Sequence, residues 1–110
     1  MDIKIENKDN CVVVNLEGKL DSVTSGEAEN KLKEILAGDQ KNILINFENL
    51  KYISSAGLRV LLIMAKKAKA TQSKLILSSL LPEVQDVFNI SGLVSLFEIH
   101  DSVEEAVKSF

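Results

Sequence analysis

The sequence predicts a small α/β domain in which short strands alternate with helices. Five apolar runs have the length and pattern of strands, and segments with helical periodicity separate all but the first two of them. Alternation of this kind implies parallel strands that are joined by crossover helices. With 110 residues, of which 45% are hydrophobic, the chain fits one domain over residues 1–110 with a single core.

The chain is expected to begin with a β-hairpin. Residues 2–6 alternate between polar and apolar types, and residues 11–16 form a nearly continuous apolar run. Asp9 and Asn10 lie between the two runs and are turn formers. Cys11 begins the second run and is expected to act as a small core hydrophobe.

A first helix is predicted after this hairpin. Thr24 and Glu27 have the spacing of a capping box, in which two side chains satisfy free backbone N–H groups at the start of a helix. Gly38 marks the end of the helix. The apolar residues that repeat at helical spacing are Ala28, Leu32, Ile35 and Leu36.

The middle of the chain predicts two buried strands, at residues 42–47 and 74–79, with a second helix between them. Pro82 suits the first turn of a third helix, and Gly92 signals its end. The apolar face of this third helix holds Val84, Val87 and Phe88.

The chain is expected to close with a brief strand at residues 96–100 and a fourth helix. Asp101 and Glu104 have cap spacing for this helix. Its apolar face holds Val103, Ala106, Val107 and Phe110. The predicted order of elements is therefore β-β-α-β-α-β-α-β-α.

Composition excludes several classes of function. The net charge of -3 gives no overall basic field for nucleic acid. One cysteine and one histidine provide neither an intramolecular disulfide nor a metal-ligand spacing. The N-terminal residues lack the apolar region of a signal peptide, and no apolar stretch is long enough to cross a membrane. We therefore expect a cytoplasmic protein without a metal, a cofactor, or a nucleic-acid or membrane partner.

Ser54 and Ser55 stand where a strand ends and the second helix begins, and three roles are open to them. One of the two is expected to cap the helix by accepting a backbone N–H. A nucleophilic serine needs a base, and because His100 is the only histidine we assign no catalytic residue and expect no enzyme activity. The N-terminus of a helix also tolerates a phosphate dianion, so a phosphoserine fits there.

The second helix has two apolar arcs when its residues are placed 100° apart. The arc predicted to face the sheet holds Leu58, Leu61, Leu62 and Ala65. The opposite arc holds Ala56, Val60 and Ile63, with Met64 at its flank and Arg59, Lys66 and Lys67 interleaved. Apolar residues ringed by charge favour a protein-binding surface. The alternative is a wide buried face that takes in Val60 and Met64.

Three stretches make the chain resemble the STAS domain family, and within it the stand-alone bacterial anti-sigma factor antagonists. The stretches are LEGKLDSVTS at residues 16–25, LINFENLKYISSAGLRVLL at residues 44–62 and VFNISGLVSLFEIHDSVEEAV at residues 87–107. The resemblance spans nearly the full chain. It implies a mixed β-sheet of about five strands with four helices packed mainly on one face.

The resemblance also implies a regulatory function. In that family a serine before a helix glycine is phosphorylated by a partner that is both an anti-sigma factor and a serine kinase and that uses ATP. The unmodified antagonist binds this partner and frees the sigma factor, and a serine phosphatase is the expected second partner. The family pattern D-S-[ST]-G-L, aligned on Gly57 and Leu58, places Ser55 at the phosphoacceptor position. Ser54 takes the place of the usual aspartate and is the alternative acceptor.

The family segment G-x-L-D matches residues 18–21, from Gly18 to Asp21. The resemblance therefore implies that Asp21 lies beside Ser55 at the docking surface, and the alternative role of Asp21 is to cap a turn. The residues expected to bind the partner are Asp21, Ala56, Arg59, Val60, Ile63 and Lys67, and those expected to surround the phosphosite are Asp21, Ser54, Ala56 and Gly57.

Three other functions stay open. The chain fits a STAS interaction module of another bacterial system, such as lipid transport or a signalling complex without a sigma factor. It also fits a small serine hydrolase that uses Ser55, or a module that senses a small anion or nucleotide at the same helix N-terminus. The protein is expected to be a monomer or a weak dimer.

Overall fold

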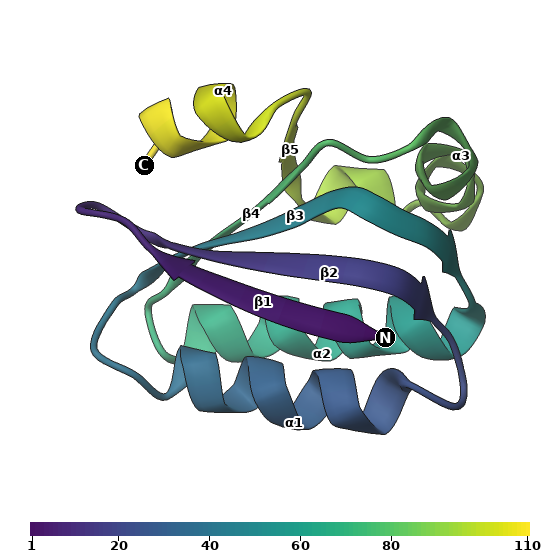
Figure 1. Ribbon diagram of the computed structural model, residues 1–110, viewed down its shortest axis with the longest axis horizontal. Coiled ribbons are helices and arrows are strands. Elements are labelled where there is room, and N and C mark those ends of the chain that lie inside the picture. Colours follow the sequence, from purple (N-terminus) through teal and green to yellow (C-terminus); the bar gives the residue numbers. More distant parts are fainter.

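A five-stranded mixed sheet with the strand order β1-β2-β3-β4-β5 forms the centre of the computed structural model, which describes residues 1–110 (Figure 1). The strands are β1 (Asp2–Asn7), β2 (Val12–Leu20), β3 (Asn42–Ile53), β4 (Lys74–Ser78) and β5 (Glu98–His100). β1 and β2 form the antiparallel hairpin, and the other neighbouring strands are parallel. The predicted hairpin and parallel pairings are confirmed.

Four helices connect and follow the strands in the predicted order. They are α1 (Ser25–Leu36), α2 (Ser55–Ala70), α3 (Pro82–Ser91) and α4 (Val103–Lys108), with a short 3-10 helix η1 at Leu93–Leu96. Leu96 belongs to η1, so the last strand is shorter than predicted. None of these helices combines the length and the apolar character that crossing a membrane requires.

The core has two parts because side chains alternate between the faces of the sheet. The larger part holds buried residues of β2 and β3 together with those of α1, α2 and α3, and Phe47 meets Phe88 edge to face with ring centroids 6.0 Å apart. The smaller part lies on the opposite face under α4: Cys11, Val13, Leu44, Ile76 and Ala106. Figure 1 shows α1 and α2 below the sheet and α4 above it. The buried residues of α1, α2 and α3 all belong to the larger part of the core, so the helices pack mainly against one part of it, and α4 is the exception.

Two predicted helix caps are wrong. Thr24 precedes α1 but makes no side-chain cap, because its hydroxyl donates to the carbonyl of Lys19 at 2.8 Å. α4 begins one residue later than predicted, and the hydroxyl of Ser102 accepts the N–H of Glu105 at 3.2 Å. Pro82 at the start of α3 and Gly92 at its end, with φ of 77°, are confirmed.

The main prediction for the rotation of α2 is wrong, and the alternative of a wide buried face is confirmed. Val60 and Met64 are 3% and 0% exposed, so they belong to the core, whereas Leu58 and Leu62 are only partly buried. Val60 therefore offers no surface to a partner. Ile63 is partly buried against the larger part of the core and does not point away from it as predicted.

Candidate functional site

The candidate site lies where β2 and β3 end side by side. Leu20 and Ile53 are the last paired residues of these parallel strands, so Asp21 and Ser54 leave the sheet at the same edge. The N–H of Ser54 donates to the carbonyl oxygen of Leu20 at 2.9 Å. The fold thus brings together two segments, one ending at Asp21 and one starting at Ser54, that are remote in the sequence.

The two serines have different roles at the start of α2. The hydroxyl of Ser54 accepts the backbone N–H of Gly57 at 3.3 Å, so Ser54 is the cap. Ser55 is the first residue of the helix, its side chain is exposed, and it takes part in no side-chain hydrogen bond within the protein. The prediction that one of the pair caps the helix is confirmed, and the hydroxyl of Ser55 is accessible.

Gly57 allows the first turn of α2 to lie directly against the ends of the two strands. A Cβ atom at this position would stand 2.7 Å from the carbonyl oxygen of Leu20 and 2.8 Å from Cγ1 of Ile53. Real Cβ atoms essentially never approach other atoms this closely. A side chain at Gly57 would therefore push the helix, and Ser55 with it, away from the loop that holds Asp21.

Asp21 caps the turn between β2 and α1. Its Oδ1 accepts the N–H groups of Val23 at 2.9 Å and Thr24 at 3.1 Å. The hydrogen bond from the backbone of Thr24 is the main reason why the pKa of Asp21 lies below its usual range. The expected alternative role of Asp21 is confirmed, and this role holds a carboxylate charge at the edge of the site.

A basic stripe runs along the exposed side of α2 from Ser55. Arg59 and Lys66 follow at helical spacing, with the partly buried Leu62 between them. Neither Leu62 nor Lys66 was among the residues expected to bind the partner: Leu62 was placed against the sheet, and Lys66 was named only among the charges around the opposite arc. The spacing from Ser55 through Arg59 and Leu62 to Lys66 is the signal that identifies this stripe. Lys67 is exposed but projects about 120° away from Ser55 around the helix axis.

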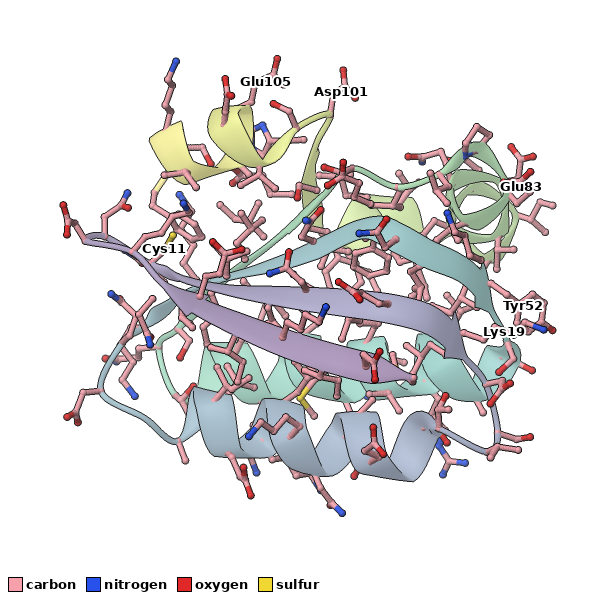
Figure 2. All side chains as sticks on the ribbon, in the orientation of Figure 1. Cys11, Lys19, Tyr52, Glu83, Asp101 and Glu105 are labelled. Carbon is pink, nitrogen blue, oxygen red and sulfur yellow. The ribbon has the colours of Figure 1, made fainter.

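Exposed apolar side chains stand near this stripe and were also missed. Tyr52 is 50% exposed and pairs in register with Lys19, and Figure 2 shows both residues at the end of the sheet next to the start of α2. Val23, in the turn that Asp21 caps, is 88% exposed. Exposed apolar residues among charged ones are typical of protein-binding surfaces. The apolar Val23 inside a polar loop is the sequence signal for this part of the surface.

His100 is engaged elsewhere in the structure. Its Nε2 lies 2.6 Å from Oε2 of Glu98, and this hydrogen bond is the main reason why the pKa of Glu98 is lowered. Neither Ser54 nor Ser55 hydrogen-bonds His100. The structure contains no group of three or more His, Cys, Asp and Glu side chains placed to hold a metal ion.

Known proteins resemble this chain over nearly its whole length. The model of the STAS domain family matches residues 2–106. BtrV of Bordetella bronchiseptica, which is assigned as an anti-sigma factor antagonist, is 34% identical over 110 residues, covering 100% of this chain and 95% of BtrV.

Two solved structures of SpoIIAA are also similar. The anti-sigma factor antagonist SpoIIAA in its unphosphorylated form has a TM-score of 0.81 and 28% identity, covering 98% of this chain and 95% of that chain. The Bacillus cell fate determinant SpoIIAA in its phosphorylated form has a TM-score of 0.74 and 27% identity, covering 98% of both chains.

Proposed function

The chain belongs to the STAS domain family, and from this premise we propose that it is an anti-sigma factor antagonist controlled by phosphorylation. In its unphosphorylated state it binds an anti-sigma factor that is also a serine kinase, and the sigma factor is released. The kinase uses ATP to phosphorylate Ser55, which ends the complex, and a serine phosphatase restores the binding form. The protein acts by binding and catalyses no reaction of its own.

The observation that carries this proposal is the division of roles between the two serines. Ser54 satisfies the N–H of Gly57, so Ser55 is not needed to hold the helix and its hydroxyl is open to a kinase. SpoIIAA, a relative that matches nearly the whole chain, has been solved with and without phosphate. Both facts support Ser55 as the phosphoacceptor, with Ser54 as the alternative.

A phosphate on Ser55 is compatible with the folded domain. The N-terminus of α2 favours negative charge, and Arg59 lies four residues further along the same side of the helix. Phosphorylation would therefore act on the complex with the partner and leave the fold unchanged.

In the complex the added charge weakens binding by repulsion. The phosphate brings a charge of about -1.5 to -2 to the docking surface, where it faces any acidic group of the partner. The carboxylate of Asp21 is present before docking too, so it adds to the loss of affinity only where the partner desolvates it. A dianion about 6 Å from one carboxylate of the partner costs about 1.4 to 5.5 kcal/mol for effective dielectric constants of about 80 to 20. This corresponds to a loss of affinity of about tenfold to ten-thousandfold.

The proposed docking surface follows from exposure. It contains Asp21, Ala56 and Arg59, as the sequence predicted, and extends to Leu62 and Lys66 along α2 and to Val23 and Tyr52 beside it. Lys67 and Ile63 lie at its margin, and Val60 is excluded because it is buried.

The test is intact-mass spectrometry with site mapping on the protein purified from its native cells, with and without stress. We expect one phosphate on Ser55 whose amount changes with conditions. The matched variants are Ser55→Ala, which should carry no phosphate, and Ser54→Ala, which should still carry it. The variant Ser55→Ala should keep the partner bound during purification, whereas Ser55→Asp should lose it.

Two results would contradict the proposal in different ways. Phosphate that persists on the Ser55→Ala variant would show that another residue is the phosphoacceptor. The absence of phosphate under every condition, with Ser55→Asp binding normally, would favour a STAS interaction module in lipid transport or in a signalling complex without a kinase switch.

A further inference from the structure

The outer edge of the sheet at β1 is unpaired. β1 stands at the end of the strand order and pairs only with β2. Five of its six residues are exposed, so no other element covers the strand (Figure 1). An exposed edge of this length presents free backbone donors and acceptors to another strand.

The hydrogen-bond phase of the hairpin fixes which groups point outward. The N–H of Lys8 donates to the carbonyl of Cys11 at 2.9 Å, so these opposite residues form a hydrogen-bonded pair. Such pairs alternate along an antiparallel ladder, and the β1–β2 register has no shift. The backbone groups of Lys4 and Glu6 therefore point toward β2. Those of Ile3, Ile5 and Asn7 point away from β2 to the free edge.

We propose that this edge binds a second copy of the chain, with two β1 strands paired antiparallel about a two-fold axis at Ile5. Ile5 then exchanges both backbone hydrogen bonds with Ile5 of the second copy. Ile3 pairs in the same way with Asn7 of the second copy. The two sheets join into one continuous sheet, and the interface is the same patch on both subunits.

Charge complementarity selects this register. Lys4 stands opposite Glu6 of the second copy, and Asp2 stands opposite Lys8, and the symmetry repeats each pair. The two adjacent registers with the same hydrogen-bond phase are unfavourable. One places Lys4 opposite Lys4 and Asp2 opposite Glu6, and the other places Glu6 opposite Glu6 and Lys4 opposite Lys8.

The apolar side of the edge fits the same arrangement. Ile3 packs against the larger part of the core, and Ile5, on the same face of β1, is 38% exposed. Pairing about Ile5 places the two Ile5 side chains against each other on that face. Lys4 keeps 66% of its side chain exposed despite its 3.4 Å ion pair with Glu17, so it remains available to the second copy.

The first test measures the oligomeric state by sedimentation equilibrium over a wide concentration range. We expect a reversible dimer whose association constant falls about tenfold in Lys4→Glu and in Glu6→Lys, because each variant places like charges opposite one another twice. The double variant with both changes exchanges the charges and should recover the dimer. Circular dichroism confirms that all variants are folded. A monomer at every concentration, or a dimer that the single variants leave unchanged, would overturn the proposal.

The second test uses hydrogen exchange read by NMR at low and high protein concentration. The amides of Ile3, Ile5 and Asn7 should exchange more slowly as concentration rises. The amides of Lys4 and Glu6 already bond β2 and should change little, so they are the internal control. Equal behaviour of the two sets would contradict pairing through this edge.

Discussion

At the scale of single residues, Gly57 fixes how closely α2 approaches the ends of β2 and β3. The variant Gly57→Ala should lower the free energy of unfolding by about 1 to 3 kcal/mol, because its Cβ would meet backbone 2.7 Å away that has no room to move. Gly26 in α1 is the matched control, since a Cβ there meets nothing within 4 Å. Gly26→Ala should leave stability unchanged or raise it by up to about 1 kcal/mol. Urea denaturation measures both, and equal effects would contradict the close approach.

Asp21 gives stability a defined dependence on pH. Its pKa is lower in the folded state than in the unfolded chain, mainly because it accepts the N–H of Thr24. Such a carboxylate stabilises the fold above its unfolded pKa, and this contribution is lost as the pH falls through the folded pKa. Asp21→Asn should therefore melt at a lower temperature than the parent protein at neutral pH, and the difference should shrink in acid. A difference in melting temperature that is constant from neutral to acidic pH would show that the charge of Asp21 has no part in the cap.

At the scale of elements, the rotation of α2 is the main point at which sequence and structure differ. Met64 is fully buried, as the alternative of a wide buried face predicts, whereas Leu62 is only partly buried and does not face the sheet as the main prediction had it. Met64→Ala should therefore cost about 2 to 5 kcal/mol of unfolding free energy, and Leu62→Ala about 1 kcal/mol. Thermal or urea unfolding of the two variants decides between the orientations. A larger loss for Leu62→Ala would restore the orientation predicted from sequence.

The order of the elements could be predicted because each element has its own local pattern. Alternation in β1, helical spacing in α1 and the residues Pro82 and Gly92 around α3 act over a few neighbouring positions. The rotation of α2 could not be predicted from the sequence, because apolar residues occur on both of its arcs. The rotation depends instead on the contact between Gly57 and Leu20, which are remote in the sequence.

The sequence-based prediction of the candidate site has a different basis. Ser55 and Asp21 were expected from the family resemblance, and the parallel pairing of β2 with β3 explains why the segments that carry them leave the sheet at the same edge. The assignment of the cap to Ser54 and the exposure of Val23 required the structure. The predicted cap at Thr24 failed because Asp21 satisfies the nearby N–H groups and the Thr24 hydroxyl bonds Lys19.

At the scale of the whole molecule, the two faces of the sheet are covered unequally. α1, α2 and α3 cover the larger part of the core, whereas the six-residue α4 covers the smaller part. Two hydrogen bonds tie the end of the chain to the rest, from Asn10 to the carbonyl of Val107 at 3.1 Å and from Lys74 to the carbonyl of Ser109 at 2.7 Å. Because Ala106 is also fully buried, we expect α4 to unfold together with the sheet.

Cys11 can report whether α4 and the sheet unfold together, because it lies under α4 (Figure 2). Its side chain is 1% exposed, and burial raises the pKa of its thiol, so the native protein should react slowly with a thiol reagent. If α4 and the sheet form one unit, labelling of Cys11 and loss of helical circular dichroism should share one urea midpoint. Cys11→Ser, which has no thiol, controls for non-specific labelling. Labelling at a urea concentration that leaves the dichroism intact would show that α4 detaches first and exposes Cys11 while the sheet remains folded.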